Sequence, residues 1–227
     1  MKKNLSAISA LTDYVNLERL TFLIDGVYAI TITLLVLELR PPESNTEDLT
    51  ASLLAMLPRL SIYLIAFYSI ANHWVVHQRM FRHITDADST LLWLTILGLL
   101  FITLIPATTA IVGRFPAERL AAACFSANSF FQAMATWAFW AYVVRNQKQF
   151  AANSDVRLLS ITSQVWLVIA VGWLVSILLG FVNVKLAYAS WVLWPNLVAV
   201  WGTRRRRLLF SKDRRRTDNQ GRSAPQM

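Results

Sequence analysis

The sequence predicts an all-α polytopic membrane protein with six transmembrane helices in each chain. Of its 227 residues, 56% are hydrophobic, and the mean hydropathy is +0.44. This composition is too apolar for an ordinary soluble domain. Charged residues make up 15% of the chain, and most of them lie between the apolar runs. Each run reaches about the 20 residues that a helix needs to cross the hydrocarbon core of a bilayer.

The six spans can be placed by their length and by the residues that interrupt them. Pro41 and Pro42 close the first span, because proline cannot continue a helix. Pro106 lies inside the third span and predicts a kink there. The predicted spans cover 19–39, 51–78, 89–112, 117–144, 157–181 and 186–202.

Basic residues predict the orientation of the helices. Lysine and arginine gather on one side, and the other side receives fewer of them, accompanied by Glu43, Glu47, Asp48 and Glu118. The positive-inside rule therefore places both termini in the cytoplasm, which fits an even number of spans. The basic positions on that side are Lys2, Lys3, Arg19, Arg79, Arg82, Arg145, Lys148, Arg157 and Arg204 to Arg207.

The chain divides into a cytoplasmic N-terminal segment (1–18), a six-helix transmembrane domain (19–203) and a basic cytoplasmic tail (204–227). The tail is expected to be disordered after its first turn. Its arginines could attract anionic lipid or could serve only to fix the topology. Much of the net charge of +9 lies there, so topology explains the charge and no nucleic-acid partner is predicted. The residues concerned are Arg204, Arg205, Arg206 and Arg207.

The first span carries an apolar stripe and a carboxylate on different sides. At 100° per residue, Asp25 lies about 140° around the helix from Ile30. A charge at bilayer depth costs roughly 2.5–3.5 kcal/mol on insertion scales, so Asp25 needs a partner or a purpose. Either the stripe faces a lumen and Asp25 is a structural acceptor, or Asp25 faces a lumen and acts as a carrier site. The residues within about 60° of one another are Leu23, Gly26, Ile30, Thr33, Leu34 and Leu37.

This helix resembles the first helix of the transmembrane protein 175 type of potassium channels, whose bacterial members carry one six-helix repeat. That family has the pattern Arg-x-x-x-Phe-Ser-Asp followed by a run like Gly-Val-Phe-Ala-Ile-x-x-Thr-Leu-Leu-Val-Leu-Glu. The chain has Arg19 and Asp25 at that spacing, and the run from Gly26 to Glu38 matches. It departs from the pattern in having Leu23 and Ile24 in place of the Phe-Ser pair.

The resemblance implies a potassium-selective, leak-type channel formed by a homotetramer in the bacterial inner membrane. It places the first helix at the axis, with Ile30 as the narrowest ring and Leu34 and Leu37 as successive rings outward. Thr33 then supports the neighbouring ring through its hydroxyl. No cofactor is expected, and K⁺ is the permeant ion. A hydrophobic constriction of this kind can gate by dewetting.

The resemblance also implies a polar cluster and an acidic mouth. Arg19, Asp25, Trp74 and His77 would clamp the first helix to the second at the cytoplasmic side. Acidic residues after the first helix would repeat around the outer mouth and concentrate cations there. They would equally suit a solvated loop. The positions nearest the mouth are Glu38 and Glu43.

Other polar residues in the spans favour structural roles. His73 and His77 lie four residues apart on one face, but no third ligand accompanies them, so no metal site is predicted. Asn128, Gln132 and Gln164 are expected to hydrogen-bond between helices.

Three classes of function stay open from the residues alone. The first is the channel, the second is a cation- or proton-coupled transporter that uses Asp25, and the third is a membrane scaffold with a basic tail. No catalytic motif or pair of carboxylates occurs within a span, so an enzyme is not predicted. The single cysteine, Cys124, offers no disulfide.

Overall fold

All regular structure in the described part of the chain is helical. The computed structural model of the protein describes residues 16–39, 49–151 and 154–222. The elements are α2 (Leu17–Leu34), the 3₁₀ turn η1 (Leu35–Glu38), α3 (Leu49–Phe81), α4 (Ser89–Thr103), α5 (Ile105–Arg114), α6 (Arg119–Arg145), α7 (Gln147–Phe150), α8 (Val156–Val182) and α9 (Val184–Arg222).

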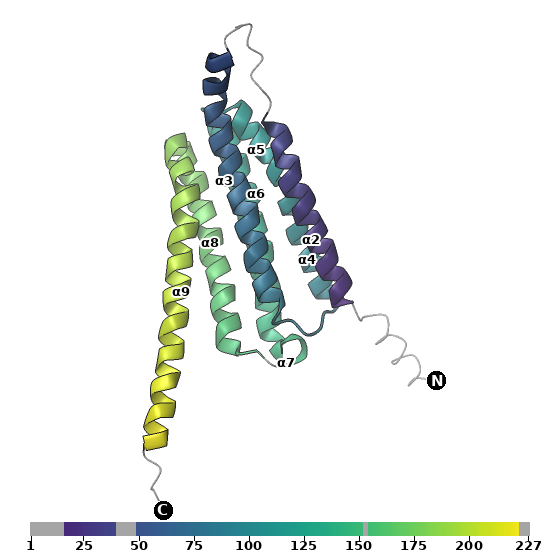
Figure 1. The fold of residues 1–227 in the computed structure, drawn as a ribbon, viewed down its shortest axis with the longest axis vertical. Coiled ribbons are helices and arrows are strands. Elements are labelled where there is room, and N and C mark those ends of the chain that lie inside the picture. The colour runs from purple at the N-terminus through teal and green to yellow at the C-terminus, as the bar shows by residue number, and fades with distance from the viewer. Residues whose placement is uncertain (1–15, 40–48, 152–153, 223–227) are drawn as a thin grey trace, which may run out of the picture.

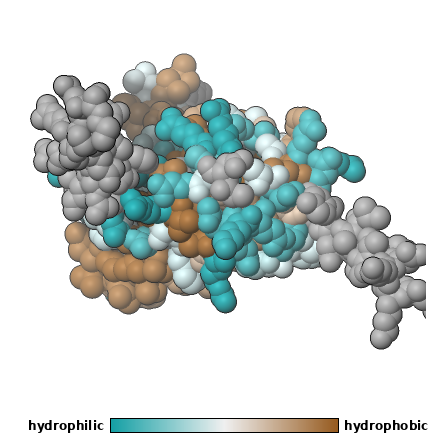
Figure 2. Space-filling model, turned by 90° about the horizontal axis from the view of Figure 1, so that it is seen from below, coloured by the Kyte–Doolittle hydropathy of each residue, from teal (hydrophilic) through white to brown (hydrophobic). Residues whose placement is uncertain are grey.

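The long helices form one bundle and run along a common axis (Figure 1). Helix α6 packs against α8 and α4, α8 packs against α9, and α2 packs against α3, α4 and α5. The start of α2, the ends of α3 and α9, and the short α7 lie toward the same end of the bundle (Figure 1). This end is covered mainly by hydrophilic residues, with hydrophobic residues at its margin (Figure 2).

Four segments of the described chain are long and apolar enough to cross a membrane. They are Leu17–Glu38, Leu49–Arg79, Ser89–Arg114 and Val156–Val182. Helix α6 is as long as α8, at 27 residues, but it is less apolar. The reason is that α6 lies inside the bundle and buries polar side chains, which lower its hydropathy without facing lipid. These side chains are Ser126, Asn128, Ser129, Gln132 and Thr136.

The predicted kink at Pro106 is confirmed as a break between two helices. Helix α4 ends at Thr103 and α5 begins at Ile105, so that Pro106 occupies the first turn of α5. Proline is tolerated there because the first backbone N–H groups of a helix have no partner within that helix.

Side-chain caps set the starts of three helices at the hydrophilic end of the bundle. The side chain of Asn16 accepts a hydrogen bond from the backbone N–H of Arg19, and α2 begins at the next residue. Asp88 and Asp155 cap α4 and α8 in the same way. Asp88 also accepts from the hydroxyl of Tyr142 at 2.8 Å, which ties α4 to α6. An oxygen-bearing N-cap is worth about 1 kcal/mol relative to alanine.

Helices α8 and α9 approach each other closely at Gly172. The indole of Trp194 lies over this glycine and donates to the carbonyl of Val168 at 3.2 Å. A Cβ atom at position 172 would overlap the indole ring of Trp194. Gly172 is therefore a packing requirement of this helix pair.

Replacing Gly172 with alanine should lower the free energy of unfolding by about 1–3 kcal/mol, the usual range for an overpacked core. The physical reason is the overlap with Trp194, which the indole can relieve only by leaving the Val168 carbonyl. Thermal unfolding in detergent measures the change. Gly113→Ala is the matched control, since a Cβ there meets nothing within 4 Å. An equal effect at both positions would contradict this account of the α8–α9 contact.

The tail departs from the expected disorder, because α9 continues as a helix to Arg222. Its first arginines hold it against α8: Arg205 donates to Gln164, and Arg206 donates to the hydroxyl of Thr162 at 3.3 Å. Arg205 also lies over the ring of Trp201, 5.2 Å from its centroid. The interhelical role expected for Gln164 is thus confirmed.

Candidate functional site

One face of α2 packs into the bundle. Tyr28 is 2% exposed on this face, and its ring stacks on that of His73 in α3, with the centroids 5.9 Å apart. The hydroxyl of Thr31 donates to the carbonyl of Val27 at 2.7 Å, so its polar atom is satisfied within the helix. Burial on this side therefore fixes the rotation of α2 in the chain. The buried side chains, with Leu35 just after α2, are Leu20, Ile24, Tyr28, Thr31 and Leu35.

The opposite face of α2 is uncovered in the single chain and carries the predicted stripe. Ile30 is 60% exposed and Leu37 is 58% exposed, which is high for large aliphatic side chains. The hydroxyl of Thr33 donates to the carbonyl of Ile30 at 2.8 Å. A contiguous apolar surface of this kind marks an interaction surface or a contact with lipid. The exposed members are Leu23, Gly26, Ile30, Thr33, Leu34 and Leu37.

Asp25 lies on a different side of α2 from the stripe and is held by α3. The same carboxylate oxygen, Oδ1, accepts from Trp74 Nε1 at 2.9 Å and from Gln78 Nε2 at 2.8 Å. These donors satisfy a carboxylate that would otherwise be costly at the edge of a bilayer. Asp25 therefore acts as a structural acceptor that joins α2 to α3.

The structure brings three of the four predicted cluster residues together. His77 lies beside Asp25, lines the same cavity and stacks on Phe81, with the ring centroids 4.4 Å apart. Arg19 does not join them: its side chain is exposed and bonds to no described residue. Gln78 was not predicted, although it lies one turn after Trp74 on the same helical face, a spacing that could have identified it.

Replacing Gln78 with leucine should lower the stability of the α2–α3 contact by about 1–2 kcal/mol, because it removes one of two charge-assisted hydrogen bonds to a partly buried acceptor. Thermal unfolding of the reconstituted protein measures the loss. Gln149→Leu, an exposed glutamine at the hydrophilic end, is the control. If both variants unfold like the original protein, Gln78 makes no contribution through Asp25.

A second polar contact lies deeper in the bundle. His73 is 8% exposed and accepts a hydrogen bond from Gln132 of α6, with the nearer ring nitrogen at 2.8 Å. The His73 ring also lies against Trp166 of α8, with the centroids 4.7 Å apart. Asn128 donates to the carbonyl of Phe101 at 3.0 Å. The expectation that Asn128 and Gln132 bond between helices is confirmed.

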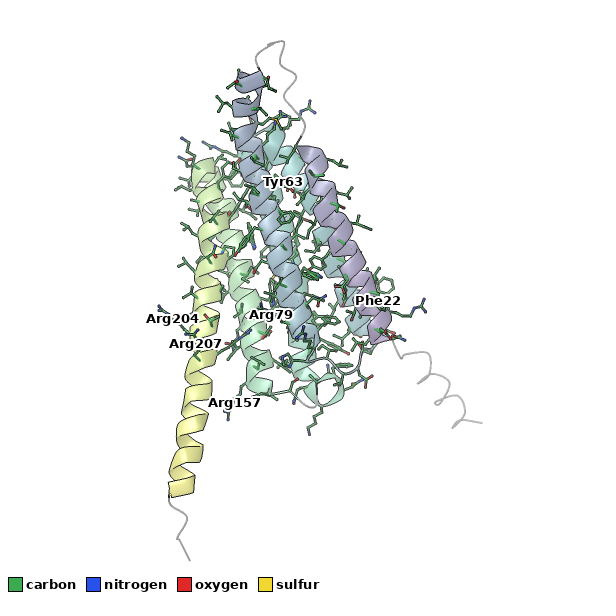
Figure 3. The ribbon with its side chains drawn as sticks, viewed as in Figure 1. Phe22, Tyr63, Arg79, Arg157, Arg204 and Arg207 are labelled. Atoms are coloured by element: carbon green, nitrogen blue, oxygen red, sulfur yellow. The ribbon has the colours of Figure 1, made fainter. Side chains whose placement is uncertain are left out.

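The remaining predicted site residues lie near the two ends of the bundle. Glu38 closes η1 at the end of the first span, while Glu43 lies outside the described residues. Arg79, Arg157, Arg204 and Arg207 lie in the other half of the bundle, on α3, α8 and α9 (Figure 3). Among the described histidine, cysteine and acidic side chains, no group of three could hold a metal ion.

The chain is similar to known potassium channels. A sequence model of the family described as endosomal/lysosomal potassium channel TMEM175 matches residues 19–106, which include α3, α4 and all but the first two residues of α2. A potassium channel of Streptomyces collinus is 29% identical over 171 residues, which are 73% of this chain and 83% of that protein. A potassium channel of Chamaesiphon minutus is 31% identical over 137 residues, which are 58% of this chain and 68% of that protein.

A solved structure has the same fold. It is the crystal structure of a lysosomal potassium-selective channel TMEM175 homologue from Chamaesiphon minutus, with a TM-score of 0.72 and 25% sequence identity. The similarity covers 82% of this chain and 97% of that one. The family is a class of ion channel, which is distinct from enzymes, and it is an integral membrane family. The chain belongs to the TMEM175 family of channels.

Proposed function

We propose that the chain forms a potassium-selective leak channel, with α2 of each subunit around a central pore. The observation that carries the proposal is the uncovered aliphatic face of α2, which lies opposite the face that packs into the bundle. One helix cannot enclose a pore, so the face needs other copies of the chain. Closed cyclic symmetry provides them, and a homotetramer is the arrangement that the family resemblance implies. The relatives from Streptomyces collinus and Chamaesiphon minutus are described as potassium channels.

The proposed constriction is a set of aliphatic rings. Ile30 forms the narrowest ring, and Leu34 and Leu37 follow toward the outer mouth, where Glu38 and Glu43 concentrate cations. Thr33 supports the Ile30 ring, since its hydroxyl already bonds the carbonyl of that residue. Water leaves a narrow apolar ring readily, so such a pore can close without a side-chain plug.

The transporter alternative is not favoured, because Asp25 is occupied. Its carboxylate oxygen accepts from two side chains of α3. A carrier site would need this acid to release those donors in every cycle, whereas the channel leaves them in place. We therefore propose that Asp25, Trp74 and His77 have a structural role: they hold α2, the proposed pore helix, against α3. Arg19 lies at the start of α2 and would find its partner in another subunit.

The proposed topology has six spans. Four of them are the apolar segments given above, and the other two are α6 and α9. This topology places both termini in the cytoplasm of a bacterial inner membrane, since Arg79, Arg157, Arg204 and Arg207 lie in the same half of the bundle (Figure 3). Arg205 and Arg206 form hydrogen bonds to side chains of α8. Arg204 and Arg207 are exposed, so these two arginines are the ones that would contact anionic lipid.

Reconstitution into liposomes with opposed potassium and sodium gradients tests the proposed function. A channel should carry current that reverses near the potassium equilibrium potential, at a rate far above that of a carrier cycle. A saturable flux coupled to protons would support the transporter instead. If the correctly folded protein gives no flux, the channel and the transporter are both excluded, and the membrane scaffold is the remaining hypothesis.

A further inference from the structure

A cavity opens between α3 and the helices α6 and α8. It is lined by Asn72 and His73 of α3, by Gln132 of α6 and by Ile169 of α8, and a volume of about 60 Å³ in it is open to water. Gln132 and Ile169 are the central residues of their helices, so the cavity lies near the middle of the proposed spans. Asn72 is exposed at the surface of the chain, so the cavity can be reached from the side of the bundle.

Three polar side chains of this cavity need hydrogen-bond partners. Ser129 is 7% exposed, and its hydroxyl bonds to no other described residue. Gln132 uses its amide N–H groups on His73 and Thr136, so its carbonyl oxygen is left without a described partner. The side-chain amide of Asn72 bonds to no described residue either. Unpaired polar groups are unfavourable at this depth, because the hydrocarbon region supplies no water to them.

The rest of the wall is mostly apolar. The rings of Trp166 and Trp173 line the cavity from α8, and Pro195 lines it from α9. The Trp166 ring also lies against His73, with the centroids 4.7 Å apart. Among the described lining residues, none is a carboxylate, a lysine or an arginine. The cavity therefore offers hydrogen bonds and aromatic surface but no counter-charge.

Water alone would fill this space poorly. About 10–15 Å³ of such volume is enough for one water molecule, so the cavity has room for roughly four to six. Each buried water needs about two to four polar partners, which three unpaired side chains in an apolar wall do not provide. A single hydroxyl group uses the same three side chains fully. It can donate to the carbonyl of Gln132 and accept from the hydroxyl of Ser129 and the amide of Asn72.

We propose that this cavity is a binding site for a small uncharged alcohol of about six heavy atoms, which enters from the hydrocarbon region of the bilayer. Its hydroxyl lies among Asn72, Ser129 and Gln132, and its apolar part lies against the two tryptophan rings. An ammonium or a carboxylate is rejected, because a charge at this depth would find no partner.

The site is separate from the proposed pore. None of Ile30, Leu34 and Leu37 lines the cavity. Helix α3 packs mainly against α2, α5 and η1 and makes little contact with α8 or α9, so a bound alcohol would join α3 to α8. The site lies within one chain, and its existence depends neither on the oligomeric state nor on potassium conduction.

Titration with trifluoroethanol, an alcohol of this size, tests the proposal directly. The full chain, labelled with ¹⁵N-tryptophan in lipid nanodiscs, gives indole N–H signals by NMR, and Trp166→Phe and Trp173→Phe assign the two signals of the site. Both signals should shift and reach a plateau as the alcohol concentration rises. Trp93 is 67% exposed and reports alcohol dissolved in the lipid, while the buried Trp191 lies outside the cavity and should not shift.

Two further compounds test which chemistry the site selects. In 1,1,1-trifluoropropane a methyl group replaces the hydroxyl at nearly the same size, and trifluoroacetate carries a charge. The share of each compound that dissolves in lipid is measured on nanodiscs without protein. After this correction, trifluoropropane should bind about tenfold more weakly than trifluoroethanol or worse, because it leaves the polar side chains unpaired. Trifluoroacetate should give no saturable shift.

A serine variant locates the hydroxyl of the alcohol. Ser129→Ala removes one donor and should weaken trifluoroethanol binding by about three- to tenfold, with no loss for trifluoropropane. Ser61→Ala is the matched control on α3, since the exposed Ser61 donates to the Pro58 carbonyl of its own helix and does not line the cavity. If Ser129→Ala fails to fold, the comparison of the three compounds on the unaltered chain still decides.

Three results would overturn the proposal. Shifts at Trp166 and Trp173 that grow without a plateau, in step with Trp93, would mean that the alcohol only dissolves in the lipid. Equal binding of trifluoropropane would mean that the polar side chains do not select a hydroxyl. No shift at all at the two tryptophans would mean that the cavity holds water only.

Discussion

Replacing Ile30 with asparagine should increase the potassium current by about tenfold or more and reduce the preference for potassium over sodium, since each ~1.4 kcal/mol removed from a barrier raises a rate tenfold. The physical reason is hydration. Ile30 is exposed on α2, and an amide at this position in every subunit would hold water in a ring that an aliphatic side chain leaves dry. Single-channel recording in planar bilayers measures both quantities.

The matched control for this substitution is Ile32→Asn, two residues further along the same helix. Ile32 packs against the buried core rather than lying on the stripe, so the same chemical change there should not raise the current. Ile30→Val, which keeps an aliphatic ring, should preserve selectivity. Unchanged conductance and selectivity in Ile30→Asn would remove Ile30 from the constriction.

Replacing Asp25 with alanine should damage folding and assembly rather than abolish transport in an intact protein. The substitution leaves the Trp74 and Gln78 side chains without their shared acceptor, at an expected loss of about 2–4 kcal/mol. The yield of folded oligomer after extraction, together with its thermal unfolding, measures this effect. Asp25→Asn keeps a neutral hydrogen-bond acceptor, so its yield of folded oligomer and its thermal stability should lie between those of the original protein and the alanine variant.

The transporter hypothesis predicts a different pattern for the same pair of variants. If Asp25 carried the substrate, both substitutions would give well-folded protein with no flux. Normal assembly of Asp25→Ala combined with a complete loss of flux would therefore count against the structural role assigned to this carboxylate.

Much of the fold could be predicted from local features of the sequence. The apolar runs gave the long helices, and the fixed backbone of Pro106 gave the break between α4 and α5. The tail could not be predicted in this way. Its composition favours disorder, but hydrogen bonds from Arg205 and Arg206 to α8 hold the start of the tail, and the helix continues beyond them.

Features of the site that depend on the geometry of one helix could be predicted from the sequence. Features that depend on how several helices pack together could not. Helical geometry alone separates Ile30 from Asp25 around α2, and the structure has them on different sides. The second donor to Asp25, Gln78, depends on how α3 lies against α2. The cavities around His73 depend on α3, α6 and α8 together, and no spacing within one helix indicates them.

Silver-ion block of a cysteine variant tests most directly whether the aliphatic face of α2 lines a shared pore. In a Cys124→Ser background, Ile30→Cys would be the chain's single thiol, and thiolates bind soft metal ions tightly. Silver ions should then block the potassium current irreversibly and protect the thiol from later labelling, while Ile24→Cys on the buried face stays unblocked. A current through Ile30→Cys that silver does not affect, in a protein whose thiol is open to lipid-soluble reagents, would contradict a pore along this face.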